Sequence, residues 1–177
     1  WNHMREFFLH WELCKMSEII KVGMADWKVC SGQDGVTTLG LGSCVGIAIR
    51  DPATGIGGLA HIMLPDSTEI RNNSNRFKFA DTGITDMVAE MVKRGAVRSH
   101  MVAKIAGGAQ MFAYGNTKSD MIRVGERNVI ASKKKLEELK IPLIAEDTGD
   151  TYGRTVIFYP ATGVFTIRAV GKPEKNI

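Results

Sequence analysis

Apolar and polar positions divide this chain into many short hydrophobic segments separated by turn-forming residues. Segments with the length and β-branched content of strands lie at 18–22, 27–30, 36–41, 45–50, 56–63, 101–106, 143–146, 155–159 and 164–170. Two longer stretches, 79–94 and 126–140, repeat apolar residues at helical spacing and are followed by the helix-ending residues Gly95 and Pro142. The pattern therefore predicts a series of short strands with two helices, and loops over 66–76 and 111–121.

The order of these segments favours hairpins. The same tetrapeptide, Pro-Ala-Thr-Gly, stands at 52–55 and at 160–163, where it separates two pairs of predicted strands. Proline and glycine favour tight turns, so each pair is predicted to form a hairpin. Strands that arrive in hairpins, with two helices inserted, predict an α+β protein with a mixed or antiparallel sheet and not a doubly wound one. The polar tail from Gly171 onward is expected to be frayed.

The length of 177 residues suits a single domain, which we expect at 16–177. Residues 1–15 differ in character from the rest, since they gather two tryptophans, two phenylalanines and two histidines before Met16. His3-Met4 resembles a cloning scar, so we expect 1–15 to be a cloning-derived or upstream extension. A native amphipathic helix at the N-terminus is the alternative.

Composition argues against several classes of protein. The net charge is +4, and the lysine cluster at 133–135 lies beside Glu137 and Glu138 on a predicted helix, as a solvated face would. Clustered basic residues with interleaved aromatics, which mark nucleic-acid binding, are missing, and no apolar run reaches the ~20 residues that span a bilayer. Three cysteines without a CxxC pair and four scattered histidines argue against disulfides and zinc, and for a reducing, cytoplasmic location. We expect no metal and no organic cofactor.

Cys44 is the first candidate for chemistry because glycines interrupt the chain just before it. Gly40 and Gly42 let the backbone adopt unusual angles and leave room for a substrate to approach. A side chain at such a break can lie at the end of a sheet, where backbone N–H groups, such as those of Cys44 and Val45, face a developing oxyanion. The alternative is a structural thiol, since free cysteines are often buried.

His61 strengthens the case for catalysis. If 45–50 pairs with 56–61 in a hairpin, the end of the second strand lies beside the start of the first, and His61 comes close to Cys44. A cysteine beside a histidine can form an ion pair that lowers the pKa of the thiol and supplies a general base. A core histidine bonded to a backbone carbonyl is the alternative.

A Cys–His pair usually needs a third group that fixes the tautomer and orientation of the imidazole. Thr38, on the preceding apolar segment, offers a hydroxyl, and a nearby carbonyl group would serve as well. By residue type, Asp66, Asp81 and Asp86 are further candidates. The residues alone do not choose among them.

Three other features carry weaker signals. The run Gly107-Gly108-Ala109-Gln110 ends a predicted strand, which suggests either a close backbone approach at the substrate groove or a simple turn. It lacks the lysine and hydroxyl residues of a phosphate-binding loop. Cys30 is expected to pack in the core, and His100 is expected to be exposed.

Several blocks of the sequence occur together in a recognisable order. They are Thr38-Leu39-Gly40-Leu41-Gly42-Ser43-Cys44-Val45-Gly46, Ala60-His61-Ile62-Met63-Leu64-Pro65, and the segments 79–82, 103–109, 125–129 and 145–149. This set resembles the CheD family of bacterial chemoreceptor glutamine deamidases. The resemblance runs from about Ile20 to Val170, and residues 1–15 match nothing in the family.

The resemblance implies a fold and a set of roles. CheD-like proteins are layered α/β sandwiches related to bacterial toxin deamidases, and their catalytic cysteine, histidine and threonine correspond to Cys44, His61 and Thr38. The implied reaction converts selected receptor glutamines to glutamates through a thioester, and some members also hydrolyse receptor methyl esters. The implied partners are methyl-accepting chemoreceptors and a CheC-type phosphatase. A catalytically silent adaptor for the same partners is the alternative, and acyl transfer to an amine is a third reading.

Overall fold

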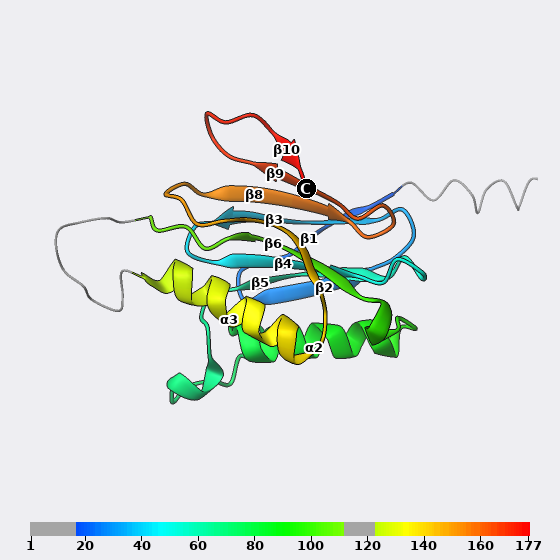
Figure 1. Cartoon of the computed structure of the whole chain (residues 1–177), viewed down its shortest axis with the longest axis horizontal. Helices are drawn as coiled ribbons and strands as arrows, with labels where there is room; N and C mark the ends of the chain where they lie inside the picture. Colours follow the sequence, from blue (N-terminus) through cyan, green and yellow to red (C-terminus); the bar gives the residue numbers. More distant parts are fainter. Residues whose placement is uncertain (1–16, 112–122) are drawn as a thin grey trace, which may run out of the picture.

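The computed structural model describes residues 17–111 and 123–177, which form three layers: two helices, a middle sheet and an outer sheet (Figure 1). In spatial order, the middle sheet contains β2 (Asp26–Cys30), β5 (Gly57–Ile62), β4 (Val45–Arg50), β6 (Val102–Gly107) and β7 (Leu143–Thr148). The outer sheet contains β1 (Ile19–Lys21), β3 (Gly35–Leu41), β8 (Arg154–Tyr159), β9 (Val164–Arg168) and β10 (Lys175–Asn176).

Both sheets are mixed. The pairs β1–β3 and β6–β7 are parallel, whereas the other strand pairs of the described ranges are antiparallel. The two predicted hairpins are confirmed as β4–β5 and β8–β9. The architecture is thus the expected α+β sandwich with two main helices, and the parallel pairs arise where a longer crossover joins the strands.

The middle sheet is buried on both faces because its strands alternate between two cores. On β4, the side chains of Val45, Ile47 and Ile49 pack toward the helices, while Ala48 packs toward the outer sheet. The helix-side core and the core between the sheets are therefore separate clusters. This alternation matters for the site, because Cys44 belongs to the core between the two sheets.

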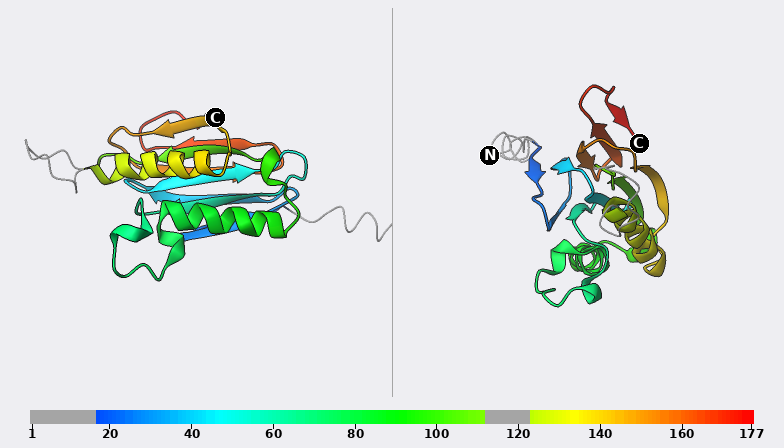
Figure 2. Two further views of the ribbon diagram at one scale, coloured as in Figure 1. Left: turned by 60° about the horizontal axis from the view of Figure 1, so that its bottom comes forward. Right: turned by 90° about the vertical axis from the view of Figure 1, so that its left-hand side faces the viewer.

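Helices α2 (Ala80–Lys93) and α3 (Val124–Glu138) lie side by side on the middle sheet, on the face that points away from the outer sheet (Figure 2). The apolar face predicted for α2 is confirmed, because it buries four residues at helical spacing: Ile84, Met87, Val88 and Met91. The face of α3 differs from the prediction, since Ile130 is 57% exposed. The buried face of α3 instead consists of Gly125, Asn128 and Ser132 together with Leu136.

The expectation of a frayed tail after Gly171 was wrong. Residues 175–176 form β10, which pairs with β9 at the edge of the outer sheet. The hydroxyl of Thr166 donates to the side-chain oxygen of Asn176 at 2.7 Å, and the backbone N–H of Ile177 donates to Phe165 at 3.0 Å. Backbone pairing, which needs no apolar side chains, orders this polar segment.

The predicted loop at 66–76 contains one turn of 3₁₀ helix, η1 (Ser67–Glu69), and leads into another, η2 (Arg76–Lys78); a third, η3 (Arg98–His100), follows α2. The expectations for residues 1–15 and for most of 111–121 lie outside the described residues. Within the described ranges, no helix is both long and apolar enough to cross a bilayer.

Candidate active site

The register of the β4–β5 hairpin brings Cys44 and His61 to one face of the middle sheet. His61 lies directly opposite Gly46. Cys44 comes two residues before Gly46, so its side chain points to the same face and is a diagonal neighbour of His61. Glycine at position 46 adds no side chain between the two groups. The predicted hairpin is therefore confirmed, and it places Cys44 and His61 on the same face of the sheet, although within the described ranges no hydrogen bond joins Nε2 of His61 to the thiol.

The imidazole of His61 is completely buried and is held by a residue of the outer sheet. Nδ1 of His61 lies 2.7 Å from the hydroxyl oxygen of Thr38 on β3. The hydroxyl of Thr38 donates its single proton to the carbonyl oxygen of Val22 at 2.8 Å. It must therefore accept the bond from His61, which assigns the proton of the neutral imidazole to Nδ1.

This arrangement leaves Nε2 of His61 as the basic nitrogen. Nε2 is buried and has no hydrogen-bond partner within residues 17–111 and 123–177. Burial lowers the pKa of His61 to about 4, because the charged imidazolium is poorly solvated between the sheets. At neutral pH the ring is uncharged and keeps a lone pair on Nε2.

Cys44 is 9% exposed. Burial raises the pKa of the thiol, and the backbone N–H of Cys44 itself only partly offsets this. The two directions of shift, up for Cys44 and down for His61, differ from the ion pair expected from the sequence. The pair is suited to proton transfer during attack, with the imidazole as general base, and not to a thiolate formed beforehand.

A bulge in β3 changes which side chains of the outer sheet point toward the middle sheet near Cys44. The pairing of β3 with β8 shifts register between Thr38 and Leu41, and Gly40 has a φ of +70°. That left-handed conformation favours glycine. The shift turns Leu41 inward, where its Cδ1 atom lies 3.0 Å from the position a Cβ atom would take on Gly46. The glycine at 46 thus makes room for the packing of Leu41.

The paired glycines at the end of β6, Gly107 and Gly108, approach the backbone of Cys44. Gly107 has a φ of +108°, and a Cβ atom there would lie 2.3 Å from the carbonyl oxygen of Cys44. The backbone N–H of Gly108 donates to that same oxygen at 2.8 Å. The close approach predicted from the sequence is therefore present, and it serves to hold Cys44.

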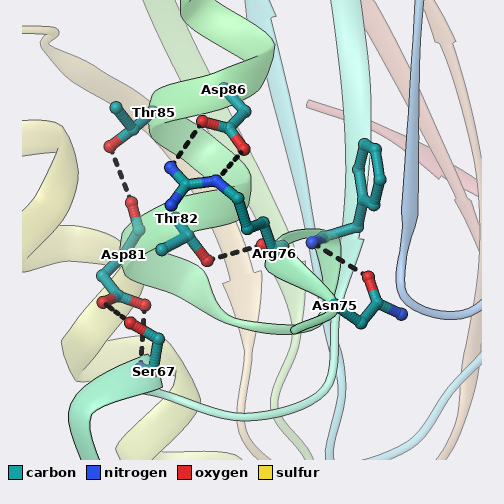
Figure 3. A network of polar contacts seen from close by, with 8 residues as sticks. Ser67, Asn75, Arg76, Asp81, Thr82, Thr85 and Asp86 are labelled. Carbon is teal, nitrogen blue, oxygen red and sulfur yellow. Dashed lines mark hydrogen bonds and ion pairs between the residues drawn. The ribbon is translucent and has the colours of Figure 1, made fainter. Parts of the chain in front are cut away.

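The three aspartates considered as partners for His61 are all engaged elsewhere. Figure 3 shows Asp81 in the first turn of α2 and Asp86 in the second turn, where both bind residues of the segment that precedes the helix. The bonds are Ser67 N–H and Oγ to Asp81 at 3.0 and 2.6 Å, Arg76 to Asp86 at 2.7 and 2.8 Å, and Thr68 to Asp66 at 2.8 and 2.7 Å. Of the candidates named from the sequence, Thr38 is the one that contacts His61.

Sequence reasoning missed Asn128. This residue is fully buried on α3, and its side-chain nitrogen donates to the carbonyl oxygens of Ser43 and Met63, both at 2.9 Å. It thereby links the turn before Cys44 to the residue that follows β5. The available signal was a polar residue three positions after Gly125, on the face that the helix turns inward.

The remaining sequence-based expectations concern residues away from the site. Cys30 is buried as expected, and burial, aided by the nearby Asp34 carboxylate, raises its pKa to about 11. The side chain of His100 is 52% exposed, as expected. Lys133 and Lys135 form surface ion pairs, which fits a solvated face. Among the described residues, no three His, Cys, Asp or Glu side chains are grouped as a metal site.

Comparison with known proteins gives consistent results. The family model described as "CheD chemotactic sensory transduction" matches residues 63–169. A protein of Lachnoclostridium phytofermentans named "Probable chemoreceptor glutamine deamidase CheD" is 58% identical over 162 residues, which cover 92% of this chain and 100% of the relative. A protein of Halalkalibacterium halodurans named "Chemoreceptor glutamine deamidase CheD" is 47% identical over 163 residues, with the same two coverages.

The solved structure of the Bacillus licheniformis hypothetical protein YfiH is 16% identical to this chain, with a TM-score of 0.44. The match covers 70% of this chain and 50% of that chain. This similarity is too low to support an inference. The two relatives establish the family of this chain, because each is well above 30% identical to it over most of both chains. The family model adds a match over more than half of this chain. The chain belongs to the CheD family.

Proposed function

We propose that this chain is a chemoreceptor glutamine deamidase of bacterial chemotaxis, with Cys44 as nucleophile, His61 as general base and acid, and Thr38 as the residue that orients the imidazole. The observation that carries the proposal is the 2.7 Å contact between Thr38 and His61, which leaves Nε2 unprotonated on the face that carries Cys44. The names of the relatives supply the reaction and the class of substrate.

In the first half of the reaction, Nε2 of His61 takes the proton of the Cys44 thiol while Sγ bonds to the carboxamide carbon of the target glutamine. The electron pair of the C=O double bond moves to oxygen and forms a tetrahedral oxyanion. The C–N bond then breaks, and the proton on Nε2 passes to the departing nitrogen. Ammonia leaves, and the glutamine side chain remains as a thioester on Cys44.

In the second half, Nε2 accepts a proton from water, and the resulting oxygen nucleophile attacks the thioester carbonyl. The C–S bond breaks, the proton on Nε2 returns to sulfur, and the side chain leaves as glutamate. A receptor methyl ester would follow the same path with methanol as the leaving group, so we extend the proposal to methylesterase activity. An amine in place of water would give acyl transfer.

The surface around Cys44 is suited to a protein substrate. Met111 is 43% exposed, and its side chain lies within 3.2 Å of the position a Cβ atom would take on Gly42, in the turn before Cys44. This apolar side chain is available for contact with a protein substrate. We propose that a chemoreceptor docks here and that a CheC-type phosphatase competes for the same surface. We assign the protein to the cytoplasm, where the free thiols of Cys30 and Cys44 remain reduced.

The test is mass spectrometry of a receptor cytoplasmic fragment after incubation with wild-type protein, Cys44→Ala or Cys30→Ala. Wild type and Cys30→Ala should convert specific glutamines to glutamates and release ammonia, whereas Cys44→Ala should lose the activity by roughly 10⁴-fold or more. Full activity in Cys44→Ala would refute the assignment of the nucleophile. Tight binding of the fragment by wild type without any conversion would favour the silent adaptor.

A further inference from the structure

The three carbonyl groups of the turn that ends at Cys44 are all bonded toward the interior of the protein. Each accepts a hydrogen bond either from one of the two residues that directly follow β6 or from α3. The bonds are Ala109 N–H to Gly42 at 2.8 Å, Asn128 Nδ2 to Ser43 at 2.9 Å, and Gly108 N–H to Cys44 at 2.8 Å. The middle bond is the one that a side chain makes.

The bond from Asn128 fixes the direction of the N–H group of Cys44. The carbonyl of Ser43 and the N–H of Cys44 belong to one peptide unit, and in a trans peptide these groups point in opposite directions. When Asn128 holds the carbonyl of Ser43 toward α3, the N–H of Cys44 points away from α3. That N–H faces the sulfur of its own residue, where it lowers the pKa of the thiol against the larger effect of burial.

A backbone N–H beside the attacking sulfur is well placed to receive the oxyanion. The tetrahedral oxygen forms one bond away from the carbon that Sγ attacks, so its stabilising donor must lie close to the sulfur. Donors of this kind act through their fixed orientation, because they do not have to reorganise as charge develops. The rigidity of the Ser43–Cys44 peptide is then a condition for catalysis.

Asn128 is built to supply that rigidity. It is fully buried, and the same Nδ2 atom also donates to the carbonyl of Met63, two residues after His61. The backbone of α3 approaches closely here because Gly125 has no side chain: a Cβ atom on it would lie 2.5 Å from the carbonyl oxygen of Ala109. Oδ1 of Asn128 is buried without a partner among the described residues. The hydrogen bonds of this side chain are thus made by its nitrogen, while its buried oxygen stays unpaired among the described residues.

We propose that Asn128 is a positioning residue for deamidation, which holds the Ser43–Cys44 peptide so that the N–H of Cys44 stabilises the oxyanion of the tetrahedral intermediate. The proposal rests on the proposed function and adds a residue that acts only through its neighbour. Asn128 does not touch the reacting atoms. Its removal should slow the steps that pass through an oxyanion and should spare the reactions of Cys44 that do not.

Alkylation by iodoacetamide separates these two classes of reaction. In alkylation the Sγ–C bond forms as iodide leaves, and no oxyanion develops. Asn128→Ala and the shape-preserving Asn128→Asp should both lower kcat for deamidation of a receptor fragment by about 10²-fold, with little change in KM. The limiting rate of Cys44 alkylation at high pH, where the thiol is ionised in every variant, is followed on the Cys44 peptide by mass spectrometry and should stay close to that of wild type.

Ser132→Ala is the matched control. It removes a buried hydrogen bond from the same helix, the 2.7 Å bond from Ser132 to the backbone oxygen of Asn128, without touching Ser43. Ser132→Ala should keep the wild-type kcat. The inference is overturned if the Asn128 variants keep full kcat, if deamidation and alkylation fall together, or if neither variant folds, since the amide would then be a structural lock alone. An active Cys44→Ala would instead refute the proposed function, so the two failures are distinguishable.

Discussion

The core between the two sheets contains two buried thiols, and the difference between their surroundings is what favours Cys44 as the proposed nucleophile. Cys30 is 4% exposed and Cys44 is 9% exposed, and burial raises the pKa of both. Both belong to the same apolar cluster. Burial and the direction of the thiol pKa therefore do not separate the proposed nucleophile from Cys30.

The difference lies in what surrounds each sulfur. Cys30 donates weakly to the carbonyl oxygen of Asp34 at 3.8 Å and has the carboxylate of Asp34 nearby, which disfavours a thiolate. Cys44 shares its face of the sheet with His61, whose free Nε2 can take a proton. A base that acts during the attack makes a preformed thiolate unnecessary.

The largest expected effect comes from removing that base. His61→Gln leaves Cys44 with no group that can accept its proton, so its surroundings come to resemble those of Cys30. We expect kcat for deamidation to fall by about 10²–10⁴-fold, measured as ammonia release from a receptor fragment. His100→Gln, at a histidine whose side chain is 52% exposed, is the control and should keep full activity. Wild-type kcat in His61→Gln would mean that another group serves as the base.

The next effect is a pH dependence of stability that the surroundings of His61 create. The pKa of His61 is about 4 in the folded protein and about 6.5 in an unfolded chain. Between these values the unfolded state binds a proton that the folded state does not. The free energy of unfolding should therefore fall by up to about 3 kcal/mol as the pH decreases from 6.5 to 4.

Urea denaturation at several pH values measures this decrease. His61→Gln removes the titrating group, so its stability should depend less on pH over the same window. The expected sign is fixed: the contribution is fully present above pH 6.5 and is lost as the pH falls toward the folded-state pKa of about 4. Equal slopes for wild type and His61→Gln would show that other groups cause the loss.

A smaller effect is expected from the hydroxyl that orients the ring. Thr38→Val removes the acceptor of the Nδ1 proton, and leaving a buried donor unpaired costs ~1–3 kcal/mol, which corresponds to a loss of kcat of roughly tenfold to a hundredfold. Thr37→Val is the control, because the Thr37 hydroxyl donates to the carbonyl of Val156 at 2.8 Å and does not contact His61. Thr38→Ser should recover most of the activity. Equal kcat in Thr38→Val and Thr37→Val would exclude an orienting role.

The smallest effect compares one glycine near each thiol. Gly40, before Cys44, and Gly32, after Cys30, have φ values of +70° and +64°, and an added Cβ atom would meet open space at both. Alanine at either position should cost about 1–2 kcal/mol in stability. In Gly40→Ala alone, strain in the β3 bulge should also lower kcat a few-fold. If both variants keep full activity at the same loss of stability, the bulge matters only for folding.

The sequence predicted the helices and hairpins better than it predicted the burial of polar residues and the pKa directions. The hairpin of 45–50 with 56–61, the buried face of α2 and the exposure of His100 depend on spacing along the chain, and all three are confirmed. The polar tail at 175–176 and the polar inner face of α3 were missed, because backbone pairing and a buried amide give no apolar signal. The ion pair expected between Cys44 and His61 stays a prediction, and the pKa directions of the two groups, which follow burial between two sheets, run against it.

By itself, the sequence determined that Cys44 and His61 lie near the same end of one hairpin, since a turn at 52–55 between two short strands brings the ends of the hairpin together. The tertiary structure decided what the pair can do. Thr38 comes from the opposite sheet, and Asn128 from a helix far along the chain. Tautomer, protonation state and the direction of a peptide N–H are set by such distant partners and by exclusion of water. None of these is encoded in local spacing, because each arises only when separate layers pack together.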